Sequence, residues 1–121
     1  MDERDYTTEI SEDGEVLRIV VHGAMEFART SRFVTLVRDT AKARGRRRVL
    51  IDARAFKQAM PNKDRFAMGE LIGEEWRGLR VAIVNPIAAE NGFVETVAVN
   101  RGADTRTLAT VPEALDWLQR S

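Results

Sequence analysis

The chain has 121 residues, enough for one domain with one hydrophobic core, and its 44% hydrophobic and 31% charged residues are typical of a soluble globular protein. Nineteen basic side chains balance nineteen acidic ones, so the basic excess of nucleic-acid-binding proteins is missing and we expect no nucleic-acid partner. Cysteine is absent, which excludes disulfides, thiolate metal sites and cysteine nucleophiles.

The apolar stretches of the chain are short. The segment Val81–Val84 is strand-sized, far below the ~20 residues that a membrane-spanning helix needs. The charged N-terminus, Met1–Asp5, leads into no apolar run, unlike a secretory signal. We therefore expect a cytoplasmic protein without membrane insertion.

The chain opens with two strand-like segments and then alternates helices with strands. Residues Tyr6–Ile10 and Glu15–His22 flank the turn-forming segment Ser11–Gly14, which predicts an antiparallel hairpin. The pattern after the hairpin predicts a helix from Thr30 or Ser31 to Gly45, a buried strand at Val49–Asp52, a loop at Ala53–Pro61, a helix at about Asn62–Glu75, a strand at Leu79–Val84, a helix at about Ala88–Asn100 and a strand at Thr105–Ala109. A last helix should begin at the capping box Thr110–Glu113.

This alternation predicts the fold class. Strands that alternate with helices form right-handed crossovers and a parallel sheet. We expect one α/β domain over residues 1–121, with a mixed, mostly parallel five-stranded sheet, the first strand antiparallel at an edge, and four helices. The core-facing side chains should include Phe66, Leu71 and Ile72 in the second helix and Ala114, Leu115 and Leu118 in the last.

Three motifs resemble the SpoIIAA-like branch of the STAS domains. Val49–Phe56 resembles their strand followed by Asp, x, Arg, x, Phe; Arg80–Val84 is similar to their fourth strand; and Arg101–Leu118 looks like their closing strand and Glu-Ala-x-x-Trp-Leu helix. The resemblance covers nearly the whole chain. It implies a STAS fold and a regulatory, protein-binding module without catalytic residues or cofactors.

One family feature has no counterpart in this chain. In well-studied STAS domains, a serine at the start of the helix after the third strand is phosphorylated by a partner kinase. Between Thr40 and Thr96 this chain contains no Ser, Thr or Tyr. The resemblance therefore implies a STAS module without the usual phosphorylatable serine.

The candidate binding residues lie where parallel strands end. Ligands of open α/β sheets bind at the carboxyl ends of the strands, and Asp52 and Asn85 end two neighbouring predicted strands. Arg, Met and aromatic side chains supply most anchor energy in protein contacts. We expect a partner, a ligand or a second copy of the chain to engage Arg54, Phe56, Met60 and Phe66, next to Asp52 and Asn85, rather than the basic turn Arg46–Arg48.

Several residues have two interpretations. Asp52 either bonds loop amides or Arg54, or binds a cation or accepts a phosphoryl group. The basic segment Lys42–Arg48 either complements a helix C-terminus or forms a patch for an acidic partner. His22, the one histidine, has no second histidine or cysteine with which to form a metal site.

Two functions follow from these observations. The first is a non-catalytic module that binds a protein partner, including a second copy of itself. The alternative is a carrier for a small ligand or lipid, with a pocket beneath residues 53–68. An apolar cavity beside the second helix would favour the carrier.

Overall fold

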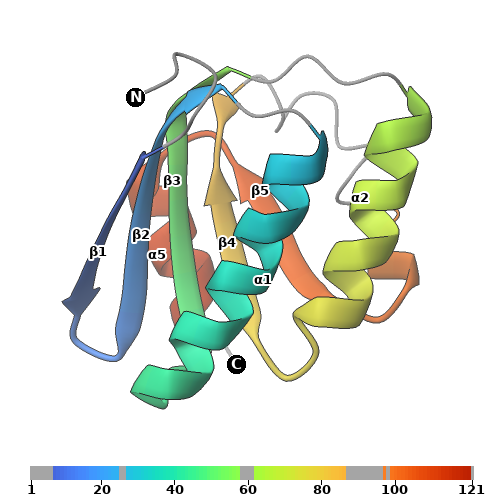
Figure 1. Cartoon of the computed structure of the whole chain (residues 1–121). Coiled ribbons are helices and arrows are strands. Elements are labelled where there is room, and N and C mark those ends of the chain that lie inside the picture. The colour runs from blue at the N-terminus through green and yellow to red at the C-terminus, as the bar shows by residue number, and fades with distance from the viewer. Residues whose placement is uncertain (1–6, 25–26, 58–61, 87–96, 98, 121) are drawn as a thin grey trace.

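A five-stranded sheet forms the middle layer of the molecule, and helices cover both of its faces (Figure 1). The computed structural model describes the chain except residues 1–6, 25–26, 58–61, 87–96, 98 and 121. The elements in chain order are β1 (Thr7–Asp13), β2 (Val16–Ala24), α1 (Phe27–Arg44), β3 (Arg48–Lys57), α2 (Asn62–Glu75), β4 (Arg80–Val84), β5 (Asp104–Leu108) and α5 (Val111–Gln119).

The order of the strands in the sheet is β1-β2-β3-β4-β5, the same as their order in the chain. The edge strand β1 is antiparallel to β2, whereas β2, β3, β4 and β5 are mutually parallel. The predicted mixed, mostly parallel sheet with an antiparallel edge is therefore confirmed. The parallel strands all begin at the lower end of the sheet in Figure 1 and end at the upper one.

Two apolar clusters hold the three layers together. The larger one joins α1 and α2 to one face of the sheet, and includes Leu17, Ile19, Phe33, Val37, Ile51, Ile72 and Trp76. The smaller one joins α5 to the opposite face, and includes Val16, Leu50, Ala82, Val84, Leu108, Ala114 and Leu118. Strand β3 supplies both clusters, since its successive side chains point to opposite faces. This explains why its sequence reads as a continuous apolar run.

The hairpin turn is tighter than the sequence predicted. Strand β1 continues to Asp13, which pairs with Val16, so that Gly14 and Glu15 alone make the turn. Gly14 has a φ of 62°, which an L side chain rarely adopts and which two-residue hairpin turns require at their first position. The predicted turn at Ser11–Gly14 is therefore wrong for residues 11–13, which are polar because they lie on an edge strand and face solvent.

Strand β3 is longer than predicted, and the expected loop Ala53–Pro61 is wrong over its first five residues. The strand runs to Lys57 because β2 continues to pair with it as far as Ala24. The register shifts between Val20 and His22, where β3 contains one extra residue. Such a bulge interrupts the regular alternation of side chains, which hid this part of the strand from the sequence pattern.

The helices agree with the prediction in part. The described residues contain three complete helices rather than four: of the predicted helix Ala88–Asn100, residues 88–96 and 98 lie outside the described part, and positions 97, 99 and 100 are helical. Helix α1 begins at Phe27, before the predicted cap at Thr30 or Ser31. Helix α2 has the predicted bounds.

Helix α5 begins at the predicted capping box. The Thr110 hydroxyl accepts a hydrogen bond from the Glu113 amide at 3.3 Å and donates one to the Glu113 carboxylate at 2.9 Å. The first of these bonds satisfies a backbone donor that the first turn leaves without an intrahelical acceptor, and the second holds the Glu113 side chain against the cap. Ala114 and Leu118 are buried as predicted, whereas Leu115 is partly buried at the edge of the cluster.

Candidate functional site

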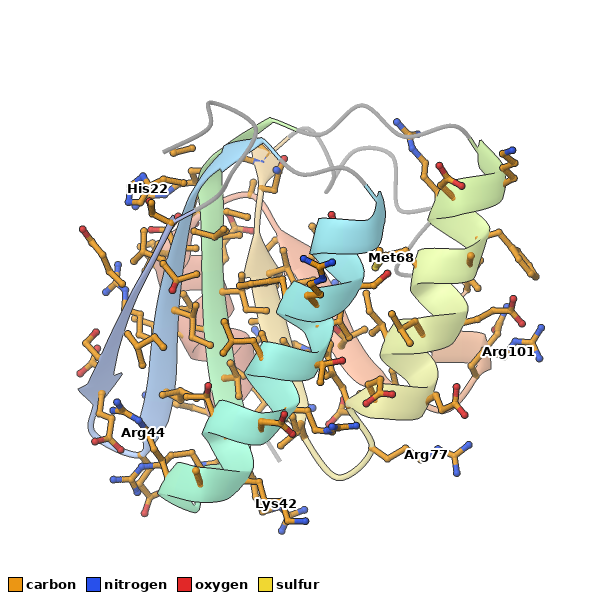
Figure 2. All side chains as sticks on the ribbon, in the orientation of Figure 1. His22, Lys42, Arg44, Met68, Arg77 and Arg101 are labelled. Atoms are coloured by element: carbon orange, nitrogen blue, oxygen red, sulfur yellow. The ribbon has the colours of Figure 1, made fainter. Side chains whose placement is uncertain are left out.

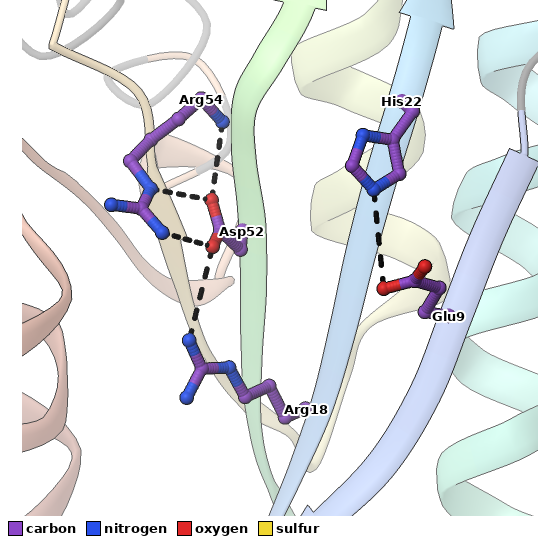
Figure 3. Close-up of polar contacts among 5 residues, drawn as sticks. All are labelled: Glu9, Arg18, His22, Asp52 and Arg54. Carbon is purple, nitrogen blue, oxygen red and sulfur yellow. Dashed lines mark hydrogen bonds and ion pairs between the residues drawn. The ribbon is translucent and has the colours of Figure 1, made fainter.

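Asp52 and Arg54 form a forked ion pair on β3 (Figure 3). Arg54 donates from Nε to Asp52 Oδ1 at 2.9 Å and from Nη2 to Oδ2 at 2.7 Å, and its backbone amide donates to Oδ1 at 3.3 Å. From the neighbouring strand β2, Arg18 Nη2 lies 3.9 Å from Oδ2. The structure thus favours the interpretation in which Asp52 accepts hydrogen bonds from the side chain and the backbone amide of Arg54.

Burial and charge fix the protonation state of this carboxylate. Asp52 is only 4% exposed, whereas the Arg54 side chain is 55% exposed. The hydrogen bonds from the Arg54 guanidinium hold the pKa of Asp52 below its ordinary value, against the opposing effect of burial. A carboxylate with a lowered pKa whose two oxygens already accept hydrogen bonds is a poor proton donor and a poor nucleophile at neutral pH.

Asn85 joins the ends of three strands. Its side-chain amide donates to the carbonyl of Ala53 on β3 at 3.2 Å, and its backbone amide donates to the carbonyl of Leu108 on β5 at 3.0 Å. Asn85 directly follows β4, so these bonds fix the carboxyl end of β4 between its two neighbours. Of the predicted site residues, the structure brings Asp52, Arg54 and Asn85 together at this end of the sheet.

Phe66 lies on a different layer of the molecule, which corrects its predicted place in the core. It is 43% exposed on α2. Helix α2 packs on the face of β3 that carries Ile51 and Ala53, whereas Asp52 shares the opposite face with Leu50. The structure therefore does not bring Phe66 next to the Asp52–Arg54 pair. The side chain of Phe56, and Met60 as a whole, lie outside the described residues.

Arg101 holds the exposed ring of Phe66 in place. The guanidinium carbon of Arg101 lies 5.9 Å from the centroid of the Phe66 ring, and Nη2 pairs with the carboxylate of Glu70 at 2.9 Å. Figure 2 shows the Arg101 side chain beside the outer surface of α2. We call Phe66, Glu70 and Arg101 the Phe66 surface. The Phe66 ring therefore has a cation within cation–π range and a carboxylate one turn along the helix.

His22 and the other ionisable groups form no recognisable catalytic or metal site in the described part of the chain. His22 is half exposed, and its Nε2 lies 4.0 Å from a carboxylate oxygen of Glu9 on β1 (Figure 3). Among the residues that the structure describes, no three His, Asp or Glu side chains gather closely enough to hold a metal ion. No described helix combines the length and the apolar character that crossing a bilayer requires.

A cavity of about 630 Å³ lies at the opposite end of the sheet, where β3, β4 and β5 begin. Its wall contains five arginines, and we call it the arginine basin: Arg46, Arg47, Arg48, Arg80 and Arg120. The sequence analysis considered Arg46–Arg48 as part of a patch for an acidic partner, but did not connect them with Arg80 and Arg120. The residues that form this cavity come from separate segments of the sequence. Strands β3 and β4 each begin with an arginine, and a glycine lies two or three residues before it.

The structure resembles two solved proteins along nearly all of its length. An anti-sigma factor antagonist from Mycobacterium paratuberculosis matches with a TM-score of 0.62 at 17% identity, covering 98% of each chain. An uncharacterised Shewanella loihica protein with a SpoIIAA-like fold matches with a TM-score of 0.56 at 19% identity, covering 93% of each chain. No protein-family model and no curated protein sequence matches this chain. The predicted fold is thereby confirmed, and the chain has the SpoIIAA-like fold of STAS domains.

Proposed function

We propose that this protein is a regulatory module of the STAS type that acts by binding a protein partner and catalyses no reaction. The observation that carries the proposal is the whole-length likeness to an anti-sigma factor antagonist, a protein named for its action on another protein. Fold alone does not determine function, so the residues must support the same conclusion.

The ionisable residues support binding over catalysis. Catalysis of group transfer needs a nucleophile next to a base, or two carboxylates with different proton affinities. Asp52, the most buried carboxylate that the structure describes, is neutralised by Arg54 and Arg18. This arrangement stabilises the end of β3 and leaves no reactive group there.

The proposed partner surface combines the predicted anchors with the Phe66 surface. Phe66 is a large aromatic side chain that remains 43% exposed, and it is held in place by Arg101. A pre-oriented aromatic ring loses little conformational entropy when a partner covers it. We assign the partner contacts to Phe66, Phe56 and Met60. Asp52 and Asn85 hold the end of β3, where Arg54 presents its exposed guanidinium.

The proposed switch differs from that of well-studied STAS domains. The chain has no hydroxyl side chain between Thr40 and Thr96, so no Ser, Thr or Tyr near the start of α2 is available for a phosphoryl group. We propose that partner binding is regulated by the amount of partner or by competition between partners.

The carrier alternative required an apolar cavity beside α2 and beneath residues 53–68. The cavity that the structure shows lies at the opposite end of the sheet and is lined by arginines. An arginine-rich wall is unsuitable for a lipid chain, because the guanidinium groups would lose their hydration. The cavity therefore does not favour a lipid carrier.

The test is a comparison of variants in partner capture and in self-association. Proteins that co-purify with the chain from its own cells are compared between the unchanged chain, the pair Phe66→Ala with Met60→Ala, and the pair Arg46→Glu with Arg47→Glu. Sedimentation velocity then reports self-association for the same three proteins. We expect the first pair to lose the partner or the second subunit, and the second pair to retain it.

A matched pair of single variants separates the Phe66 surface from charge in general. Arg101→Ala removes the cation from the Phe66 ring, and Arg77→Ala removes an equally exposed arginine that follows α2. We expect weaker partner binding only for Arg101→Ala. Binding that survives loss of Phe66 and Met60 but fails when Arg46 and Arg47 are reversed in charge would contradict the proposed surface.

A further inference from the structure

The arginine basin contains one arginine that is fixed by several contacts and four arginines with fewer contacts. Arg80 is the fixed one: Nη1 donates to both carboxylate oxygens of Asp104 at 3.0 Å, and Nη2 donates to the carbonyl of Trp117 at 2.8 Å. Its guanidinium carbon lies 3.8 Å from the centroid of the Trp117 ring. The buried Nε of Arg80 has no acceptor among the described residues. These contacts fix the position of the Arg80 guanidinium in the basin.

Arg46 donates from Nε to the carboxylate of Glu12 at 2.7 Å, whereas Arg48 and Arg120 are held by more exposed contacts. Arg48 lies 3.6 Å from Glu15, whose side chain is 83% exposed, and Arg120 pairs with Asp116 at 2.6 Å with both side chains about two-thirds exposed. Exposed pairs of this kind are weak, since solvent screens them and both side chains lose freedom. An incoming anion can therefore recruit these guanidiniums away from their present partners.

Arg47 is the least neutralised member of the basin. Its Nε donates to the carbonyl of Gly78 at 3.4 Å, and no carboxylate contacts it within the described part of the chain. Carbonyls at helix C-termini attract cations, and this attraction accounts for some of the arginines near the ends of α1, α2 and α5. It does not account for five guanidiniums around one cavity. Four of them pair with a carboxylate, namely Arg46 with Glu12, Arg48 with Glu15, Arg80 with Asp104 and Arg120 with Asp116, so the excess positive charge of the basin lies at Arg47.

Three glycines line the basin. Gly45, Gly78 and Gly102 line the cavity and have φ values of 64°, 81° and 99°. No atom lies within 4 Å of the place where a Cβ would stand at any of the three. Each glycine is required by its turn conformation, and together they leave the arginine side chains accessible from solvent.

We propose that the arginine basin binds a small soluble ligand that carries phosphate groups. The planar guanidinium fork matches phosphate oxygens in pairs, and several arginines around one cavity fit several such oxygens at once. The volume of about 630 Å³ accommodates a phosphate together with an organic group. The five arginines of this site are not among the proposed partner contacts, and they lie at the opposite end of the parallel strands from Asp52 and Asn85.

The test uses inorganic tripolyphosphate as the probe and the backbone amide resonances of the chain as the readout. We expect saturable shifts at Gly45, Gly78 and Gly102, with an affinity that falls as salt is added. Arg47→Gln should weaken binding about tenfold, which corresponds to about 1.4 kcal/mol. Arg32→Gln is the matched control, because Arg32 is an exposed arginine on α1 outside the basin, and it should leave the affinity unchanged.

The remaining outcomes decide against the proposal. Shifts that do not saturate, or that weaken equally in both variants, would show attraction to charge without a site. Binding to vesicles of phosphatidylserine, or to single-stranded RNA, without saturable binding of tripolyphosphate would assign the arginines to a macromolecular surface. A thermal melt of Arg47→Gln that matches the unchanged chain ensures that the loss reflects the ligand site.

Discussion

Arg54 donates hydrogen bonds to the carboxylate of Asp52 from its guanidinium and also from its own backbone amide, although only one residue separates Asp52 from Arg54 in the chain. In a regular strand these residues would stand side by side on one face. Here the extra residue in β3 shifts the register between Val20 and His22, and the amide of Arg54 turns toward the carboxylate. The pair thus closes the bulge, and its role is first of all structural.

Removal of the Asp52 charge should destabilise the fold. Asp52→Asn keeps the shape of the side chain but weakens hydrogen bonds that are now assisted by charge, and we expect a loss of about 1–3 kcal/mol in the free energy of unfolding. Asp116→Asn is the control, because its pair with Arg120 is exposed, and it should cost less than about 0.5 kcal/mol. Urea unfolding measures both; equal losses would contradict the structural role of Asp52.

The same pair should make stability depend on pH in acid. The pKa of Asp52 is lowered in the folded chain from its ordinary value of 3.8, chiefly by the hydrogen bonds from Arg54. The unfolded chain therefore binds this proton more readily, and stability from Asp52 is complete above the unfolded-state pKa and lost as pH falls through the folded-state value. Urea unfolding between neutral pH and about pH 2 should show a smaller loss for Asp52→Asn than for the unchanged chain.

Asp52 should resist phosphorylation by small phosphoryl donors. Its two oxygens already accept hydrogen bonds from Arg54, and the residue is 4% exposed. With acetyl phosphate or beryllofluoride we expect no saturable shift of the amide resonances around Asp52. A saturable shift that disappears in Asp52→Asn would instead identify a receiver-type switch.

Helix α5 should be essential for stability. Leu118 is fully buried against Leu50 and Val84, and Leu118→Ala should cost about 2–5 kcal/mol in the free energy of unfolding. Leu115→Ala removes the same atoms from a partly buried position and should cost less than half as much. Chemical denaturation compares the two. A chain truncated after Thr110 that keeps a native-like melting transition would contradict this assignment.

The contact between α1 and α2 depends on one buried indole. Trp76 donates from Nε1 to the carbonyl of Val34 at 2.9 Å, and its side chain is 2% exposed. Trp76→Phe removes this hydrogen bond and part of a buried ring, although the carbonyl keeps its donor within α1, and should cost about 1–3 kcal/mol in the free energy of unfolding. Trp117→Phe keeps an aromatic ring under Arg80 and should cost less than about 1 kcal/mol. Similar costs for the two would show that lost volume, and not the hydrogen bond, governs the effect.

The fold could be predicted from the sequence because the local patterns for helices, strands and caps agreed with one another. The bounds of α2, the capping box of α5 and the parallel order of the later strands were all predicted. Strand β3 was cut short because a bulge breaks the period that identifies a strand. The prediction that Phe66 faces the core is wrong because it relied on the apolar character of the side chain. The contact with Arg101 could not be predicted from a local pattern, because Arg101 is 35 residues away in the chain.

The site was less accessible to sequence reasoning. The pairing of Asp52 with Arg54 was one of two interpretations, and the structure favours it because strand geometry fixes both side chains. The sequence analysis considered the basic segment Lys42–Arg48 but not the arginine basin as a whole, since the basin forms only when three separate turns meet at one end of the sheet. Whether a side chain belongs to a shared cavity depends on topology, which a local pattern does not contain.

The strand order has a consequence for how the chain folds as it is synthesised. Each strand pairs with the strand that precedes it in the chain, so the sheet can grow by one strand at a time without waiting for a distant segment. Helix α5 comes last, yet it alone among the described helices covers the face that carries Leu50 and Val84. Until its residues leave the ribosome, the smaller of the two core clusters faces water, and this is the stage at which a nascent chain is most exposed to aggregation and to chaperones.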